Sequence, residues 1–475
     1  MFSKLAIANR GAVAARLVRA ARDLGVRSVV LCSEADMGLP YAREADDKVV
    51  IGPAPPKESY LNKDKVVAAA KRAGAEAVHP GWGFLSEDSS FAQLAEDNGL
   101  LFIGPSPKWL EVMGDKVRSR EMLSKAGLPA APATGELAGS LEERAREAKS
   151  LGFPLLIKPC GGGGGIGMMP ADSDEALLKA LEAAESQALR GFGKGAVYAE
   201  KLLVRPRHVE FQVLCDKEGS YGHLLDRDCS VQRRRQKVIE EAGAPNLDRG
   251  LVAAMAGRAA EVLGELGYDH LGTLETLYSP QTGFCFLEVN PRLQVEHGVT
   301  EMAAGFDLAA AQLRLAAGEP LSGVLKGSSP AAFSAHAIEA RIYAEDSLRF
   351  LPSPGTLKVF RPPKGEGIRV ETGYEEGAAV TPFYDPMIAQ VIAKGETREK
   401  AISKLEEALA AFEIEGLKTN IGFLRLMLRH QSFIEGSLHT SLAEELVKSP
   451  GYKEALSKLE GESQIKAFGQ KGEKH

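Results

Sequence analysis

Residues 1–110 alternate short apolar runs of β type with runs of helical period, and this alternation constrains the fold more than any other feature. Gly25 is placed to end the first helical run. Strands that alternate with helices are joined by crossovers and therefore lie parallel in one sheet. We expect an α/β fold whose parallel α/β N-terminal domain spans residues 1–113. The pattern predicts strands at 5–8, 28–32, 48–51, 77–79 and 100–103, with helices at 13–24, 63–73 and 89–97.

The rest of the chain divides at two stretches rich in Gly, Pro or Ser, at 127–132 and 327–330. The first follows a helix expected over about 106–125, and the second precedes a mixed α/β segment. In the central part we expect strands at 154–158, 197–203, 209–215, 273–278 and 284–289, with helices at 174–188 and 247–266. The expected division is a central domain over 114–328, a mixed α/β C-terminal domain over 329–446 and a tail over 447–475, frayed at 470–475.

Composition and charge exclude several classes of protein. Fifty-eight Lys and Arg against 64 Asp and Glu give a net charge of −6, which offers no basic surface for nucleic acid. The five cysteines show no CxxC spacing, so neither a disulfide framework nor a zinc cluster is favoured and a reducing compartment fits best. The sequence shows no apolar signal segment and no charge-free run long enough to span a membrane. We expect a cytoplasmic protein that binds neither nucleic acid nor membrane.

Five consecutive glycines at 161–165 follow a strand that ends in Lys158. Glycine lets backbone N–H groups approach phosphate oxygens closely, and the lysine ammonium adds positive charge beside them. The spacing matches neither GxxxxGK[ST] nor GxGxxG, so it indicates neither a P-loop nor a dinucleotide fold. A phosphate-binding loop is therefore one interpretation, and a tight structural hairpin is the other.

Glu275, Glu288 and Asn290 give a sharper signal. Glu288 and Asn290 are two residues apart on one strand and so share a face, and a turn at 280–283 can bring Glu275 opposite them. Oxygen ligands grouped in this way suit Mg²⁺ that bridges nucleotide phosphates. The alternative, two solvent-facing acids on an edge strand, is disfavoured because the apolar residues at 284–289 predict a strand buried on both faces.

Arg292, Gln294 and Glu296 would share one face if their segment is extended. A guanidinium fixed beside a carboxylate can hold a small anion and remove its proton, and an ordinary salt bridge is the alternative. The cationic run 233–237 is of a kind that is most often a solvated face, although it lies between two strands of the expected phosphate site.

Two further features carry weaker signals. The loop 79–87 follows a strand and is equally consistent with a ligand loop and with a structural turn. Cys160 is favoured as a small packing residue, because no His stands at a spacing that suggests a nucleophile.

Taken together, these motifs resemble biotin carboxylase, the ATP-grasp component of biotin-dependent acyl-CoA and pyruvate carboxylases. The glycine loop or the Glu/Asn pair alone indicates only some ATP-grasp enzyme, but the combination is specific and covers nearly the whole chain in order. The resemblance implies an ATP-grasp central domain with a glycine-loop lid over about 131–204. Its motifs stand at 7–11, 79–86, 113–116, 158–165, 207–210, 227–233, 288–297, 341, 350–355 and 417–420.

The resemblance also implies a role for each candidate residue. Glu296 would be the general base for bicarbonate, and Arg341 would stabilise the biotin enolate. The residues implied to bind ATP are Lys116, Lys158, Gly163, Gly164, Gly165, Glu200, Lys201, Leu203, His208, Gln232, Glu275 and Glu288. Those implied to hold Mg²⁺ or Mn²⁺ are Glu275, Glu288 and Asn290. Those implied to position bicarbonate or biotin are Lys237, Arg292, Gln294, Val295 and Arg341.

The implied reaction is the first half-reaction of a biotin-dependent carboxylase. Bicarbonate attacks the γ-phosphate of ATP to give carboxyphosphate, which releases CO₂ for capture by biotin. The sequence lacks an Ala/Val-Met-Lys-Met biotin attachment motif, so biotin is expected on a separate biotin carboxyl carrier protein. Carboxyltransferase subunits and a homodimer are implied as further partners. The final acceptor, acetyl-CoA, propionyl-CoA or pyruvate, is chosen by the carboxyltransferase.

The chain departs from the family pattern at Ala12, Trp82, Ile166 and Arg235, where Glu, Tyr, Arg and His are usual. Two other functions stay open. Another ATP-grasp ligase would keep the two lysines and the two glutamates of the nucleotide site, Lys116, Lys158, Glu275 and Glu288. It would have no reason to combine them with Arg292, Gln294, Glu296 and Arg341. A non-catalytic nucleotide-binding regulatory subunit is the second alternative, suggested by Ile166 and Arg235.

Overall fold

The computed structural model describes residues 1–161, 167–193, 195–326, 333–459 and 461. Glycines 163–165, Ile166, the boundary cluster at 327–330 and the tail end at 470–475 lie outside the described residues. None of the helices among the described residues is both long and apolar enough to cross a membrane.

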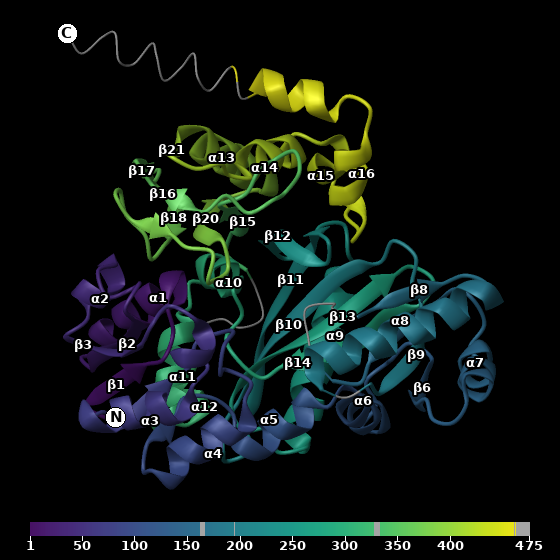
Figure 1. Ribbon diagram of the computed structural model, residues 1–475, viewed down its shortest axis with the longest axis horizontal. Coiled ribbons are helices and arrows are strands. Elements are labelled where there is room, and N and C mark those ends of the chain that lie inside the picture. Colours follow the sequence, from purple (N-terminus) through teal and green to yellow (C-terminus); the bar gives the residue numbers. More distant parts are fainter. Residues whose placement is uncertain (162–166, 194, 327–332, 460, 462–475) are drawn as a thin grey trace.

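The N-terminal part contains the expected parallel sheet, in the order β3-β2-β1-β4-β5 (Figure 1). Alternate residues of β1 point to opposite faces, so Leu5 and Ile7 pack beneath α1 while Ala6 and Ala8 pack beneath α3 and α4. Gly25 ends the α1 turn with a φ of +70°. The bounds are β1 Lys4–Ile7, α1 Gly11–Asp23, β2 Arg27–Ser33, α2 Pro40–Glu44, β3 Asp47–Gly52, α3 Lys63–Arg72, β4 Ala77–His79, α4 Ser89–Asp97 and β5 Leu101–Phe102.

The single helix expected over 106–125 is in fact two helices, α5 (Pro107–Gly114) and α6 (Lys116–Lys125). Asp115 between them has an extended backbone, and its side chain accepts hydrogen bonds from Val117 N and Arg118 N. An aspartate that caps a new helix interrupts the helical ladder at this point. The break places Lys116 in the first turn of α6.

A four-stranded antiparallel sheet, in the order β6-β9-β7-β8, follows α6. It packs against α7 and α8, and the described part of the glycine run leaves it at the end of β7. Lys158 lies on β7, as expected. The bounds are β6 Ala133–Glu136, α7 Leu141–Lys149, β7 Leu155–Pro159, β8 Met169–Ala171, α8 Asp174–Phe192 and β9 Val197–Lys201.

The largest sheet has eight antiparallel strands, in the order β14-β13-β10-β11-β12-β15-β20-β18, with α9 packed on β10 and β11. Strands β11 and β12 were not anticipated, and the cationic run 233–237 forms the tight turn between them. Its strands and covering helix are β10 Arg207–Cys215, β11 Tyr221–Arg233, β12 Gln236–Ala242, α9 Arg249–Glu265, β13 Leu271–Ser279, β14 Gly283–Asn290, β15 His336–Tyr343, β18 Ile368–Glu371 and β20 Met387–Gly395.

Strands β15, β18 and β20 belong to the C-terminal part of the chain, so the large sheet continues across the boundary expected near 328. Helix α13 packs on β15 and β20. The remaining elements are α10 His297–Ala304, α11 Leu308–Ala316, α12 Leu321–Val324, β16 Gly355–Thr356, β17 Val359–Arg361, β19 Ala379–Val380, α13 Arg398–Ala411, β21 Glu413–Glu415, α14 Ile421–Leu428, α15 Gln431–Ile434 and α16 Leu442–Lys448.

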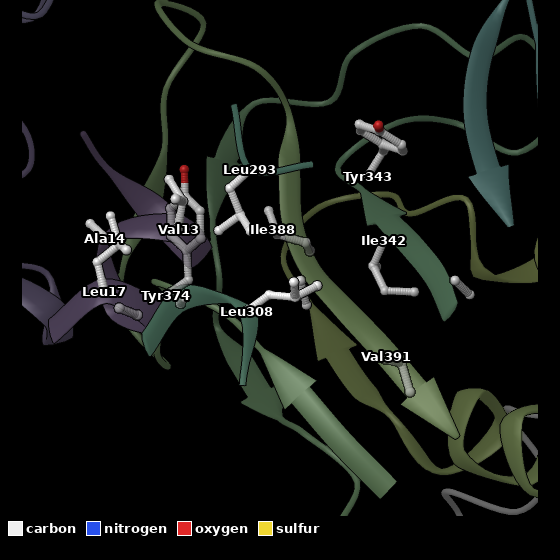
Figure 2. Packing of buried hydrophobic residues seen from close by; sticks show 14 of the residues in the cluster. Val13, Ala14, Leu17, Leu293, Leu308, Ile342, Tyr343, Tyr374, Ile388 and Val391 are labelled. Carbon is white, nitrogen blue, oxygen red and sulfur yellow. The ribbon is translucent and has the colours of Figure 1, made fainter. Parts of the chain in front are cut away.

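One hydrophobic cluster joins the N-terminal helix to these C-terminal strands (Figure 2). Leu17 of α1 lies in the same cluster as Leu293, Ile342 and Ile388, although they are far apart in the sequence. Burying such side chains stabilises each by about 1.5–3 kcal/mol relative to exposure. The cluster therefore fixes β15 relative to the segment that follows β14.

Candidate active site

Lys237, near the start of β12, lies at the centre of the site. Its ammonium donates hydrogen bonds to Glu210 Oε2 at 2.6 Å, Glu275 Oε1 at 2.7 Å and Glu296 Oε1 at 2.7 Å. All three glutamates are buried, at 0–5% exposure. Buried carboxylates need such partners, because an unpaired charge in the interior costs several kcal/mol, on the order of 3–5.

A row of charged residues crosses the large sheet beside Lys237. Arg227 on β11, Glu210 on β10, Glu275 on β13 and Glu288 on β14 are successive partners in the strand register. Like charges directly opposite each other on neighbouring strands repel. The three glutamates therefore depend on cations, which are Arg227 at one end of the row, Lys237 beside Glu210 and Glu275, and Lys116 beside Glu288.

Arg227 is fully buried and holds one end of this row. It donates to Glu210 Oε1 at 2.5 Å, Gln212 Oε1 at 2.9 Å, Thr300 Oγ1 at 3.0 Å and Thr273 Oγ1 at 3.1 Å. The guanidinium thus donates one hydrogen bond to Glu210, and its other three hydrogen bonds, to neutral side chains, hold it in place.

The hairpin β13–β14 brings Glu275 opposite Glu288, as predicted. Asn290 Nδ2 donates to Glu275 Oε1 at 2.8 Å, and Lys116 Nζ lies 2.9 Å from Glu288 Oε2. One expectation was wrong: β14 is an edge strand, and the Glu288 side chain is 28% exposed. The apolar residues of β14 are buried against helices and β13, which leaves Glu288 facing partly outward.

Arg292 and Gln294 lie beside this hairpin. Arg292 donates to Gln294 Oε1 at 3.0 Å, to Asn290 Oδ1 at 3.1 Å and to Glu87 Oε1 at 2.5 Å. Gln294 Nε2 in turn donates to Glu275 Oε1 at 3.2 Å. The loop 79–87 therefore reaches the site through Glu87, a contact that the sequence did not indicate.

We expected Glu296 to share one face of an extended segment with Arg292 and Gln294, and this expectation was wrong. Its backbone has φ −78° and ψ 10°, and it is the N-cap residue of α10. The turn carries its carboxylate away from Arg292 and toward Lys237 and Arg341. Arg341 Nη2 lies 3.0 Å from Glu296 Oε2 and 2.5 Å from Glu240 Oε1.

A pocket of about 300 Å³ adjoins Arg341 and Val295. Its other lining residues come from α1, including Ala12, from the loop after β4, including Trp82, from the start of β12 and from the C-terminal part, including Tyr384. Val295 is held by its carbonyl, which accepts a hydrogen bond from Gln390 Nε2 at 2.8 Å. The pocket is thus a cavity between distant parts of the chain with a cationic group at one wall.

The electrostatics of Lys237 and Glu296 oppose the effect of burial. Burial alone would raise the pKa of Glu296, but the charges of Lys237, Arg341 and Arg227 outweigh it and hold that pKa well below its ordinary value. Glu275 has its pKa lowered against burial by Lys237 and His208. Burial alone would lower the pKa of Lys237. The three carboxylates around it outweigh burial and raise that pKa well above its ordinary value. These groups are all ionised at neutral pH.

Lys158 and Glu200 form a second group on the four-stranded sheet. Lys158 Nζ donates to Glu200 Oε2 at 2.9 Å, and Arg120 Nη1 donates to the same oxygen at 2.8 Å. Lys201 Nζ donates to the carbonyls of 152 and 153, so its side chain is engaged by the backbone, and Leu203 is half-buried.

One backbone contact connects the second group to the first. Lys116 N donates to Cys160 O at 3.4 Å, which places the start of α6 beside the residue that precedes the glycine run. Within the large sheet, Gln232 Nε2 lies 2.8 Å from His208 Nδ1, and His208 Nε2 lies 2.9 Å from Glu275 Oε2. Cys160 is a partly buried free thiol whose pKa burial raises to about 12, as expected of a packing residue rather than a nucleophile.

The side chains of the β13–β14 hairpin carry oxygen atoms of the kind that bind a divalent cation. Glu275 and Glu288 offer carboxylate oxygens and Asn290 an amide oxygen, the hard ligands that Mg²⁺ prefers. His208, Glu210 and Glu275 also have ligand atoms within 4.8 Å of one another. Glu210 is fully buried, whereas the Glu288 side chain is 28% exposed and can be reached by an ion, so the pair Glu275 and Glu288 is the better candidate.

Besides Glu87, four charged residues on the strands around Lys237 were not among the predicted site residues. Glu210 and Arg227 stand in two of the motifs that were recognised but received no role. Glu210 and Glu339 each interrupt an apolar run, which signals a buried charge, but Arg227 stands between two aspartates and Glu240 precedes another glutamate, so they lack that signal.

Three of the four departures from the family pattern fall on described residues. Trp82 lines the pocket with its ring 5.7 Å from that of His297, and Ala12 lines the same pocket. Arg235 has a φ of +65° in the β11–β12 turn and donates to Met168 O at 3.1 Å.

A large antiparallel sheet carrying these lysines and carboxylates, beside a small sheet with a glycine-run connection, defines an ATP-grasp enzyme. Residues 115–324 match the family of the carbamoyl-phosphate synthase L chain ATP-binding domain. Residues 1–110 match the biotin carboxylase N-terminal domain, and 339–445 match the biotin carboxylase C-terminal domain. The three matches follow the order of the chain.

Known proteins with the same organisation support this assignment. The chain is 44% identical to biotin carboxylase 2 of Bacillus subtilis, over 94% of this chain and 100% of that protein. It is also 43% identical to the biotin carboxylase of Halalkalibacterium halodurans, over 94% and 98% of the two chains. The chain belongs to the biotin carboxylase family.

Solved structures agree in fold. The biotin carboxylase–β-γ-ATP complex of Campylobacter jejuni superposes with a TM-score of 0.90 at 38% identity, covering 94% of this chain and 99% of that one. The biotin carboxylase domain dimer of Hydrogenobacter thermophilus 2-oxoglutarate carboxylase, bound to MgADP, ADP and bicarbonate, gives 0.89 at 40% identity, covering 94% and 98%.

Replacing Lys237 with Met should destabilise the protein by about 3–5 kcal/mol at neutral pH, because three buried carboxylates lose their shared cation. Without Lys237, burial raises the pKa of these carboxylates above the ordinary value of 4.5, so the variant recovers stability by taking up protons as the pH falls, whereas the wild type keeps them ionised. The deficit should therefore shrink between about pH 7 and pH 4.

Thermal unfolding across that range measures the effect, with Lys237→Arg as the charge-conserving control. A deficit that does not change with pH would mean that Lys237 contributes by packing alone.

Proposed function

We propose that this biotin carboxylase uses the site around Lys237, Glu296 and Arg341 to carboxylate biotin held on a separate carrier protein, with ATP and bicarbonate as co-substrates. The observation that carries the proposal is the position of Glu296, whose carboxylate is paired with both Lys237 and Arg341 next to a pocket. An incoming anion can bind one of the two cations that flank a carboxylate. The carboxylate, which then keeps only one cation, can act as a base.

The ATP phosphates are assigned to Lys116, Lys158 and His208. Lys116 and Lys158 both lie near the start of the glycine run and neutralise Glu288 and Glu200. A polyanion would compete for these ammonium groups, since lysine binds phosphate as a mobile point charge. His208 Nε2 is buried near Glu275 but makes no well-oriented hydrogen bond among the described residues, so it is a polar atom available to a ligand.

The remaining nucleotide assignments rest on the family resemblance. Glu200, Lys201 and Leu203 are assigned to the adenine edge, Gln232 to the nucleotide through His208, and glycines 163–165 to the lid. Glu275 and Glu288, with Asn290, are assigned to a Mg²⁺ or Mn²⁺ ion, which would supply positive charge against the phosphate oxygens when bound. The domain dimer of the Hydrogenobacter enzyme, with its MgADP and bicarbonate, supports the same ligand classes here.

Bicarbonate is assigned to Lys237, Arg292, Gln294 and the backbone of Val295. As bicarbonate draws Lys237 away from Glu296, the pKa of Glu296 rises, because the charge that depressed it has moved. The carboxylate then becomes basic at the moment when it must accept the bicarbonate proton. The ionised bicarbonate attacks the γ-phosphorus, ADP leaves, and carboxyphosphate is formed.

Arg341 is assigned to the later step, at the pocket that receives the ureido ring of biotin. Carboxyphosphate breaks down to CO₂ and phosphate, and the phosphate accepts the ureido proton. Arg341 then stabilises the biotin anion until its nitrogen forms the bond to CO₂. A different ATP-grasp ligase would not need this second cationic centre.

Partners follow from the same assignment. We propose a biotin carboxyl carrier protein and carboxyltransferase subunits as partners, and a homodimer by analogy with the domain dimer named above. Five free cysteines support a reducing, cytoplasmic location. The relatives include components of pyruvate carboxylase and of methylcrotonoyl-CoA carboxylase, so either a keto acid or an acyl-CoA is compatible as the final acceptor.

Glu275→Gln and Glu288→Gln should each abolish ATP turnover while the fold is retained. Loss of a metal-binding charge leaves the phosphates less neutralised in the transition state, so the loss should lie mainly in kcat. Turnover and Mn²⁺ titration measure the effect, with Glu261→Gln on the outer face of α9 as the control. Near-normal turnover in both variants would remove the metal assignment.

Glu296→Gln and Arg341→Ser should differ in kind. Loss of the base should reduce bicarbonate-dependent ATP cleavage by about 10²–10⁴, the usual range for a general base. Arg341→Ser should spare much of that cleavage and abolish carboxybiotin formation, because the biotin anion loses its partner. ADP and carboxybiotin are measured in parallel. Normal carboxylation by Arg341→Ser, or equal loss of both activities, would contradict the role of Arg341.

A further inference from the structure

Two glutamates that have no role in the proposed chemistry lie beside Arg341. Glu240 on β12 and Glu339 on β15 are directly opposite each other in the strand register, and both are fully buried at 0% exposure. Opposed residues on antiparallel strands have Cβ atoms about 4.5–5.5 Å apart. Two ionised carboxylates at that separation in the interior would repel strongly.

The hydrogen bonds around the two carboxyl groups are incomplete. Glu240 has an Arg341 nitrogen at 2.5 Å, yet neither of its oxygens makes a well-oriented hydrogen bond among the described residues. Glu339 Oε1 accepts from Gln390 Nε2 at 2.7 Å, and its Oε2 has no partner in the same set. Buried polar oxygens without donors are uncommon and call for an explanation such as an added proton.

The charges around Glu240 and Glu339 also indicate that the pair holds a proton. The groups facing the pair are Arg341 and Tyr343 on β15, Lys237 on β12, Glu296 before α10, Gln390 on β20 and Asp385 before it. Arg341 must serve both Glu240 and Glu296, and Lys237 is shared among three other carboxylates. No described cation is close enough to Glu339 to form an ion pair. A second full negative charge on the pair would therefore lack compensation.

We propose that Glu240 and Glu339 are a positioning pair for Arg341 that holds one proton at neutral pH, mainly on Glu339, so that ionised Glu240 holds the guanidinium beside Glu296. This inference rests on the proposed role of Arg341 and adds two residues to its support. With one proton on the pair, Arg341 faces two negative charges, those of Glu240 and Glu296, instead of three. The biotin anion that forms beside Arg341 then meets less repulsion than it would with both acids of the pair ionised.

The pKa directions agree with this geometry. Burial raises the pKa of Glu240 to about 7, although Arg341 opposes the rise. Burial and the charge of Glu240 raise the pKa of Glu339 well above its ordinary value. An acid with a raised pKa binds more protons folded than unfolded, so it costs stability as the pH rises above its unfolded pKa, near 4.5.

Glu339→Gln tests the proton without requiring activity. Glutamine mimics the protonated acid and keeps the oxygen that accepts from Gln390. The variant's thermal midpoint relative to wild type should therefore increase between about pH 5 and pH 8. Glu371→Gln is the matched control, because Glu371 is buried on the same sheet but has its pKa lowered by Arg369 and Arg19, so its difference should stay flat between pH 5 and pH 8 and change only below the ordinary pKa of 4.5. A Glu339→Gln difference that is flat with pH, or that follows Glu371→Gln, would overturn the shared proton.

Glu240→Gln tests the positioning role. Misplacing Arg341 should lower carboxybiotin formation by up to about 10²-fold while bicarbonate-dependent ADP release changes much less. Glu371→Gln should not separate the two rates. Equal loss of both rates in Glu240→Gln would overturn the positioning role. Absence of biotin carboxylation in wild type would instead refute the proposed function and leave the Glu339→Gln stability result to stand by itself.

Discussion

The ammonium of Lys237 is the interaction on which the rest of the site depends. Two strands, β10 and β13, and the N-terminus of α10 bring three buried carboxylates together around it, and Glu210 and Glu275 are direct neighbours across the sheet. Without Lys237 between them and Arg227 behind them, this arrangement would repel itself. The same arrangement keeps Glu296 ionised but weakly basic until a substrate anion competes for the cation.

The charged residues of the site lie in two different environments, one partly open to solvent and one closed. The edge at β14 leaves Glu288 partly open to solvent, beside Lys116, where phosphates and a metal ion can enter. The interior at β12 and β15 is closed, and Arg341 there is held between two acids beside the pocket. The shared core of Figure 2 fixes these two regions relative to each other, because α1 packs on β18 and β20, and β20 pairs with β15, which carries Arg341.

Much of this could be predicted from sequence, and the failures have physical reasons. The β/α alternation predicted the N-terminal sheet, and two-residue spacing with a turn predicted the Glu275–Glu288 pairing. The helix over 106–125 was wrong because one capping aspartate breaks it. The extended face through Glu296 was wrong because a helix begins there, which periodicity over six residues does not reveal. Residues in register across the sheet, such as Arg227 and Glu339, were the hardest to predict, because their pairing depends on the order of strands β11, β12 and β15. A buried charge in an apolar strand shows that a partner must exist, but only the strand order identifies it.

The most direct measurement is ADP release by the purified chain with ATP and Mg²⁺, with bicarbonate and free biotin each present or omitted, and with carboxybiotin measured in the same reactions. If Glu296 deprotonates bicarbonate and Arg341 supports the biotin anion, ADP release should require bicarbonate and carboxybiotin should form only when both are present. ADP release independent of bicarbonate would indicate another ATP-grasp ligase. No ADP release under any of these conditions would indicate a nucleotide-binding regulatory subunit, and either result would contradict the central claim.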